Sequence, residues 1–95
     1  MIKSQLIELL QARNGQLEPQ DSGLIVATIL EAIARTLAAG NRVEIRGFGS
    51  FALNHRPPRT GRNPKTGQQV AVPTRYRPHF KAGKELRERV DSEAA

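Results

Sequence analysis

The segment RPPRTGRNPKTGQQV, residues 56–70, limits most strongly what this chain can fold into. It contains four cationic side chains, three prolines, two glycines and no acidic residue. Prolines cannot donate to a β-ladder, and a stretch with so few apolar side chains cannot form a core of its own. The segment is therefore predicted to be a mobile arm that becomes ordered only against another surface.

The arm is expected to be a β-hairpin that reverses at NPKTG. Pro64 presets φ for the first central position of a β-turn, Asn63 suits the position before it, and Gly67 suits the exit. The chain then returns through QQVAVPTRYRP, in which Val70 and Val72 are the few apolar residues.

The charges of the chain are divided unevenly. Between Ile45 and Lys84 there are nine lysines and arginines and no aspartate or glutamate, whereas the rest of the chain holds the other six cations and all nine acids. A solvated charged surface usually interleaves both signs. The acid-free block instead favours binding to a polyanion through its phosphates.

Two helices are predicted before this block. Residues 3–13 place leucines and isoleucine at helical spacing, with Ser4 as a candidate N-cap and Asn14 and Gly15 as a stop. A second helix is expected from Pro19 to Ala39. Its apolar stripe is too broad for one short partner helix, so it is predicted to pack against a second copy or a relative of this chain. The stripe consists of Ile25, Val26, Ile29, Leu30, Ile33, Ala34 and Leu37.

Alternation with a period of two predicts strands around Val43–Ile45 and Phe51–Leu53. The three phenylalanines, Phe48, Phe51 and Phe80, are interpreted as core residues. The GFG between the strands is too short for a phosphate-binding P-loop, which needs a longer glycine spacing followed by lysine and a hydroxyl residue.

Composition excludes several classes of protein. A chain of 95 residues without cysteine has neither a disulfide nor a cysteine metal site, and its two histidines, His55 and His79, lack the spacing of a zinc site. The most basic region offers no carboxylate to orient a catalytic base, so neither an enzyme nor a cofactor is expected. With neither a signal peptide nor a membrane span predicted, a cytoplasmic location is expected.

Three motifs carry a resemblance to a known family. The stretches EIRGFGSF, RTGRNPKTG and PHFKAGKEL are similar to those of the HU and integration host factor family of bacterial DNA-bending proteins, over nearly the whole chain. Within the family, Arg46 and the PRTGRNPKTG arm most resemble the β-subunit branch of integration host factor.

The resemblance implies an α+β fold and an intertwined dimer, either a heterodimer with an α-type subunit or a homodimer. The single domain is expected to have a helical dimerisation part at about 1–40, a β-sheet saddle with an extended β-hairpin arm at about 41–80, and a C-terminal helix at about 82–91. The implied function is nucleoid-associated and architectural. The two arms of the dimer enter the minor groove of double-stranded DNA and bend it, in support of nucleoid organisation, recombination, replication and transcription regulation.

Pro64 matches the family's intercalating proline, although spacing alone favours an ordinary turn proline. Arg46 is expected to project from the first strand into the minor groove, the alternative being an exposed ion pair with Glu44. Lys3, Lys81 and Lys84 are expected to bind phosphates on the flanks of the body. The complete predicted DNA-binding set is Lys3, Arg46, Arg56, Arg59, Arg62, Asn63, Pro64, Lys65, Arg75, Arg77, Lys81 and Lys84.

Two other functions remain open from the sequence. A basic RNA-binding or ribosome-associated protein usually adds exposed aromatic residues for base stacking, but Tyr76 is the only tyrosine and the phenylalanines are interpreted as core. A nonspecific binder of anions or membrane surfaces is the second alternative.

Overall fold

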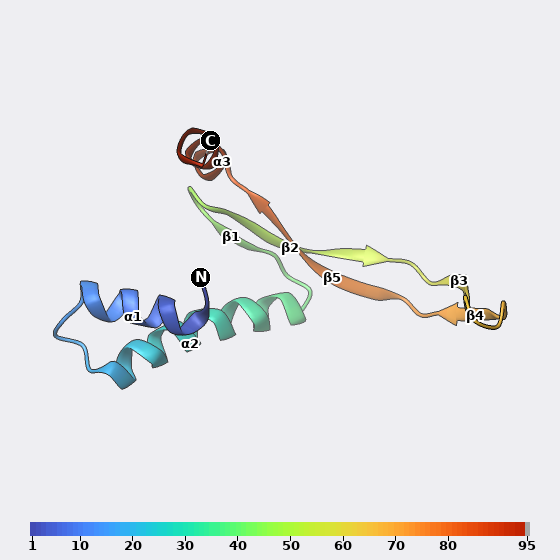
Figure 1. Ribbon diagram of the computed structural model, residues 1–95, viewed down its shortest axis with the longest axis horizontal. Coiled ribbons are helices and arrows are strands. Elements are labelled where there is room, and N and C mark those ends of the chain that lie inside the picture. The colour runs from blue at the N-terminus through green and yellow to red at the C-terminus, as the bar shows by residue number, and fades with distance from the viewer. Residues whose placement is uncertain (95) are drawn as a thin grey trace. The chain divides into compact units, whose positions relative to one another are not determined.

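The computed structural model describes residues 1–94, which form three helices and five strands (Figure 1). The chain divides into two compact units, a helical unit of residues 1–36 and a second unit that begins at residue 37. The elements are, in order, α1 (Lys3–Arg13), α2 (Pro19–Ala38), β1 (Val43–Ile45), β2 (Gly49–Arg56), β3 (Arg59–Arg62), β4 (Gln69–Val72), β5 (Arg75–Ala82) and α3 (Lys84–Glu93).

The helix ends follow local capping chemistry. α1 begins at Lys3, so the prediction of Ser4 as its N-cap is wrong: the cap is Ile2, whose backbone N–H donates to Oε1 of Gln5 at 2.9 Å. α2 starts at Pro19, as predicted, because the missing N–H of proline costs nothing in a first turn. It ends at Ala38, ahead of Gly40, whose φ of 86° is accessible to glycine at little cost.

A buried polar link connects the two helices. Ser22 of α2 is completely buried, and its Oγ donates to Oε1 of Gln11 in α1. The Nε2 of Gln11 in turn donates to the carbonyl oxygen of Leu17 in the connecting loop. One glutamine side chain therefore joins α1 to both the loop and α2.

Replacing Ser22 with alanine should lower the free energy of unfolding by about 1–3 kcal/mol, because Oε1 of Gln11 loses its donor in a partly buried hydrogen bond. Ser92→Ala is the matched control, since Ser92 is exposed in α3, and it should change stability by less than about 0.5 kcal/mol. Urea unfolding of the two variants checks this. Equal losses of unfolding free energy in the two variants would show that the hydrogen bond between Ser22 and Gln11 does not stabilise the protein.

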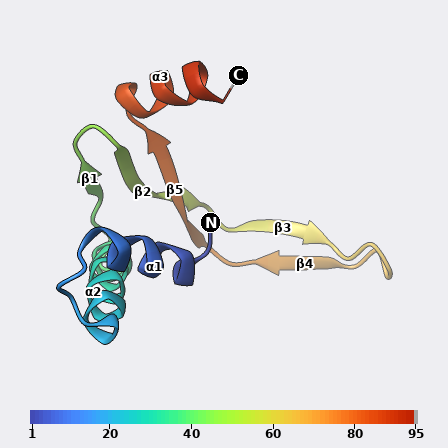
Figure 2. The same ribbon diagram turned by 60° about the vertical axis from the view of Figure 1, so that its left-hand side comes forward.

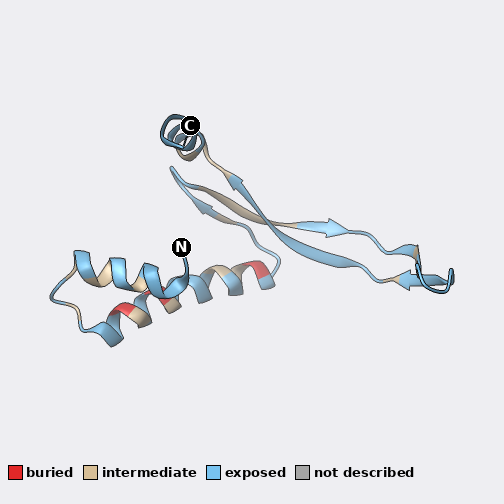
Figure 3. Cartoon of the chain, viewed as in Figure 1, coloured by how far each residue is buried: buried red, intermediate tan, exposed pale blue. Residues whose placement is uncertain are grey.

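Little apolar surface is buried within this single chain (Figure 3). Among the described residues, the hydrophobic side chains in the buried class are Val26 and Leu37, whereas Leu24, Ile29 and Leu30 on α2 stay exposed. Part of the predicted apolar stripe therefore lies uncovered, as expected for a face that packs against another chain.

The second unit contains an antiparallel sheet in the order β1-β2-β5. The two predicted strands are present as β1 and β2, and β5 continues the predicted return limb of the hairpin, which ended at Pro78, as far as Ala82. β5 lies at the edge of the sheet, where a missing N–H can be tolerated. Phe80, which pairs with Phe51 of β2, lies in the part of β5 beyond the predicted limb.

The three phenylalanines form one cluster. The ring centroid of Phe80 lies 4.8 Å from that of Phe51 and 5.3 Å from that of Phe48. Both distances fit favourable tilted aromatic pairs. The prediction that they form core is met only in part, since Phe48 is 44% exposed and Phe80 36% exposed. Within this chain alone, part of the surface of the cluster stays exposed to solvent.

The sheet leaves no room for a side chain at Gly49, which lies at the start of β2. A Cβ there would lie 2.5 Å from the carbonyl oxygen of Lys81 and 2.6 Å from Cζ of Phe80. Gly49→Ala should destabilise the protein by about 1–3 kcal/mol, because backbone and a packed ring must both move. Gly15→Ala, where nothing lies within 4 Å, is the matched control for thermal unfolding. A Gly49→Ala melting temperature equal to that of the control would contradict the expectation.

Beyond the sheet, the chain forms the predicted hairpin arm. The β2–β5 ladder runs to the pair Arg56–Arg75 and stops at the prolines, and pairing resumes as β3–β4 (Figures 1 and 2). The last helix, predicted at about 82–91, spans Lys84–Glu93. The N–H of Gly83 donates to the carbonyl oxygen of Phe48 at 2.9 Å, which ties the start of α3 to the β1–β2 turn. No helix within residues 1–94 is long and apolar enough to cross a membrane.

Candidate nucleic-acid interface

The long ribbon of β2 and β5 has two chemically different faces. Directly opposed residues of an antiparallel pair share a face, and so do residues two apart on one strand. One face therefore carries the pairs Phe51–Phe80, Leu53–Pro78 and His55–Tyr76. The other carries Ser50–Lys81, Ala52–His79, Asn54–Arg77 and Arg56–Arg75.

We call the second side the cationic face, defined by Arg56, Arg75, Arg77, His79 and Lys81. Four of these residues follow one another at every second position of β5, so their side chains form one row that leads from the sheet to the arm. The row contains no acidic residue. Such a row presents its charges to a linear polyanion without internal neutralisation.

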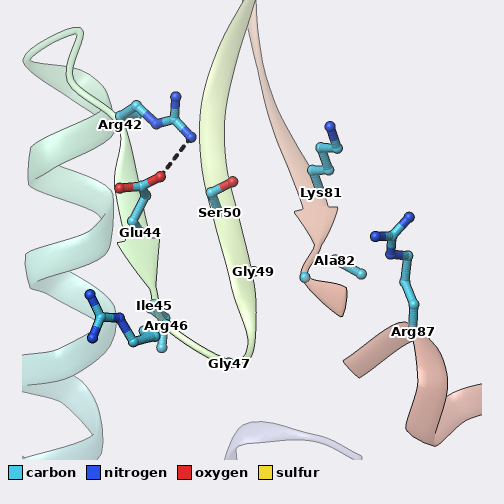
Figure 4. Close-up of a pocket in the computed structure, with 11 residues that line it drawn as sticks. Arg42, Glu44, Ile45, Arg46, Gly47, Gly49, Ser50, Lys81, Ala82 and Arg87 are labelled. Atoms are coloured by element: carbon cyan, nitrogen blue, oxygen red, sulfur yellow. Dashed lines mark hydrogen bonds and ion pairs between the residues drawn. The ribbon is translucent and has the colours of Figure 1, made fainter. Parts of the chain in front are cut away.

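A hollow of about 710 Å³ lies at the sheet end of this row (Figure 4). Its lining combines Arg42, Ser50 and Lys81 with Arg87 from α3. Several donors from β2, β5, α3 and the segment before β1 therefore converge on one concave surface.

The structure places Arg46 outside the strand on which it was predicted to lie. β1 ends at Ile45, so Arg46 lies in the turn that follows and not on the strand itself. The alternative pairing with Glu44 is also wrong, because Glu44 accepts from Nη2 of Arg42 at 3.1 Å. Arg46 still lines the hollow, and Figure 4 shows its guanidinium on the far side of Glu44 from Lys81 and Arg87.

The tip of the arm is held by its own hydrogen bonds. The carbonyl oxygen of Asn63 accepts from the N–H of Gly67 at 2.7 Å, and its Oδ1 accepts from the N–H of Lys65 at 2.9 Å. Gly67 has a φ of 72°, which confirms the predicted need for glycine. Pro64 contributes no donor to this turn and is exposed at the end of the arm.

The outer arm presents cations on both faces. Arg59 lies opposite Val72 and shares a face with Val70, whereas Arg62 lies opposite Gln69 on the other face. The remaining predicted cations lie on the body. Lys84 is the first residue of α3, and its Nζ lies 3.9 Å from Oε1 of Glu88. Lys3 is the first residue of α1 in the helical unit.

Sequence reasoning missed Arg42 and Arg87. Arg42 and Arg87 lie outside the acid-free block, next to acidic neighbours in sequence, so charge segregation could not find them. The alternation of β5 places His79 between Arg77 and Lys81 on the same face.

Ion pairing leaves the arm unneutralised. Within the described residues, the salt bridges join Arg35, Arg42, Lys84 and Arg89 to glutamates, all on exposed side chains. Such surface pairs contribute little to stability. In residues 1–94 no group of histidines and carboxylates is placed to hold a metal ion.

Comparison with known proteins agrees with this geometry. Residues 1–91 match the family model described as bacterial DNA-binding protein. The chain is 63% identical to integration host factor subunit beta of Nitrosospira multiformis over 91 residues, covering 96% of this chain and 97% of that one. It is 64% identical to integration host factor subunit beta of Chromobacterium violaceum, covering 96% and 91% of the two chains.

A solved structure shares the fold as well. HU from Anabaena, in a cocrystal with DNA, superposes with a TM-score of 0.82 at 33% identity, covering 95% of this chain and 97% of that chain. An acid-free row of cations leads onto a proline-tipped arm, and both lie on a backbone shared with HU. With the family model matched over residues 1–91, this chain belongs to the HU and integration host factor family of bacterial DNA-binding proteins.

Proposed function

We propose that this protein is a non-enzymatic architectural DNA-binding protein that bends double-stranded DNA as a β-type subunit. The observation that carries the proposal is the continuity of the cationic face with the arm, along residues 75–81 and 56–65. A duplex that follows this path exchanges many condensed counterions for arginine and lysine side chains. The additional phosphate contacts that a wrapped duplex makes offset the cost of deforming it.

The active form is a dimer. Leu24, Ile29 and Leu30 of α2 and the Phe48–Phe80 cluster leave apolar surface that a second chain can bury. The relatives named as subunit beta support an α-type partner, and pairing with a second copy of this chain is the alternative. Two copies or relatives bring two arms to one duplex.

Within the complex, Pro64 acts as the wedge at each arm tip. Its ring is exposed and lacks a donor, so it can fill an opened base step without leaving a polar group unsatisfied. Arg46 enters the minor groove from the turn after β1, where an arginine senses groove width. Arg56, Arg59, Arg62, Asn63, Lys65, Arg75 and Arg77 contact the groove or backbone along the arm, and Lys3, Lys81 and Lys84 bind phosphates on the body.

The decisive experiment measures fluorescence energy transfer between the ends of a duplex of about three helical turns. The chain is titrated alone and then with an α-type subunit. A saturable rise in transfer supports bending, and its presence without the partner shows that a homodimer suffices. Binding in both mixtures without a rise in transfer would overturn the bending proposal.

RNA binding is a second candidate because Tyr76 is 63% exposed and its ring lies 5.2 Å from that of His55. Exposed aromatic rings can stack on unpaired bases. We expect duplex DNA to displace structured RNA and anionic vesicles from the protein in competition assays at moderate salt. Preferential retention of RNA would favour the second candidate.

A further inference from the structure

A hollow at the root of the arm gathers, between the two limbs, four of the arginines that the proposed function assigns to DNA. It has a volume of about 410 Å³ and lies where the β2–β5 ladder ends and the β3–β4 ladder has not yet begun. Four arginines line it together with two prolines and a valine. The lining residues are Arg56, Pro57, Arg59, Val72, Pro73, Arg75 and Arg77.

The pairing register places the charges of this hollow close together. Arg56 and Arg75 are directly opposed in the last pair of the β2–β5 ladder, and Arg77 lies two residues from Arg75 on the same face. Like charges directly opposite each other destabilise a strand pair. The salt bridges found in residues 1–94 do not include these arginines. The two limbs of the arm therefore repel each other most strongly at the point where the ladder that joins them ends.

The backbone cannot supply that connection. Pro57, Pro58 and Pro73 have no N–H to donate, and the ladder is interrupted at these residues. The fixed φ of proline nevertheless keeps both limbs extended, so the hollow does not depend on ladder hydrogen bonds. An anion held between the guanidinium groups of Arg56 and Arg75 would both cancel the repulsion and join the limbs.

We infer that this hollow is an anion site that holds one phosphate group between the two limbs and thereby orders the root of the arm. Guanidinium groups bind phosphate oxygens through paired N–H donors, a geometry that lysine cannot provide. In the free protein the occupant is a small phosphate anion, and in the DNA complex it is a backbone phosphate. Only the statement about the DNA complex rests on the proposed function.

The test uses the full chain without DNA, titrated with pyrophosphate at constant ionic strength and followed by amide chemical shifts and hydrogen exchange. We expect saturable binding, with the largest shifts and the greatest slowing of exchange at the arm root, near residues 54–60 and 72–78. Unsaturable shifts spread over all exposed cations would overturn the inference.

Matched variants separate the site from net charge. Arg75→Gln should weaken pyrophosphate binding by about tenfold or more, the usual effect of losing a hydrogen bond between charged groups. Arg62→Gln removes the same charge from the outer arm and should change affinity by less than about twofold, because Arg62 does not line the hollow. Arg75→Lys keeps the charge but should bind more weakly than the native chain. Equal losses in the two glutamine variants would contradict a discrete site.

Duplex DNA distinguishes the two sources of phosphate. Displacement of bound pyrophosphate by DNA supports a backbone phosphate in the hollow, whereas retention of pyrophosphate in the DNA complex refutes that part. Bending without saturable pyrophosphate binding would overturn this inference alone. Pyrophosphate binding in a chain that does not bend DNA, alone or with a partner, would overturn the proposed function alone.

Discussion

Pro64→Ala should bend DNA much less than the native chain while binding it almost as well. The tip is held by the hydrogen bonds of Asn63 and Gly67, so the turn should survive the substitution. What is lost is a rigid ring that fills an opened base step, and unstacking a step costs a few kcal/mol. We expect end-to-end energy transfer at saturation to fall by roughly half or more, with less than about a tenfold loss of affinity.

The control for this variant is Pro58→Ala. Pro58 lies at the break between β2 and β3, far along the arm from the turn, so its removal tests whether any arm proline supports bending. Energy transfer at saturation should match that of the native chain. Equal bend angles for Pro64→Ala and the native chain on one duplex would show that Pro64 is only a turn residue.

The second large effect is expected from the cationic face. Changing Arg56, Arg75 and Arg77 together to glutamine removes three side chains that share one side of the β2–β5 ribbon. If each contacts a phosphate, the slope of log K against log salt should become shallower by about 2.7 for each copy of this chain in the complex, and affinity near 0.1 M salt should fall on the order of a hundredfold or more. Binding measured on one duplex at several salt concentrations checks both values.

A variant with the same net charge controls for nonspecific attraction. Arg13→Gln, Arg35→Gln and Arg89→Gln together remove three cations from the three helices. Arg35 and Arg89 form ion pairs with Glu31 and Glu93, so their charge is partly neutralised in the free protein. This variant should keep most of the native salt slope. If both triple variants lose the same slope, net charge and not the cationic face determines binding.

Much of the candidate site was predictable because its signals are local. The turn at Asn63, Pro64 and Gly67 follows from the conformational preferences of adjacent residues, and the structure confirms it through two hydrogen bonds and a positive φ. The limits of α2 follow in the same way from Pro19 and Gly40. The acid-free block identified the arm and the strand that follows it before any pairing was known.

Most of the errors have non-local causes. Ser4 is the exception, because it is a good cap by type but the neighbouring Gln5 caps the N–H of Ile2 instead. Arg46 was placed on a strand by alternation, but the ladder ends at Ile45, where β2 turns back at Gly49. Sequence reasoning missed Arg42 and Arg87, which line the hollow only because the segment before β1 and helix α3 lie beside β2 and β5.

The helices, the turn at the arm tip, the segregation of charge and the surplus of apolar surface on α2 could be read from the sequence, because each depends on residues close together in the chain. The fold was needed to establish that β5 joins the sheet despite Pro78, and that its register with β2 sorts phenylalanines to one face and arginines to the other. It also decided that Ser22 is buried against Gln11 and that Arg56 faces Arg75 across the arm. Register and burial join residues far apart in sequence, and a shift of one residue in pairing would have reversed both faces of the ribbon.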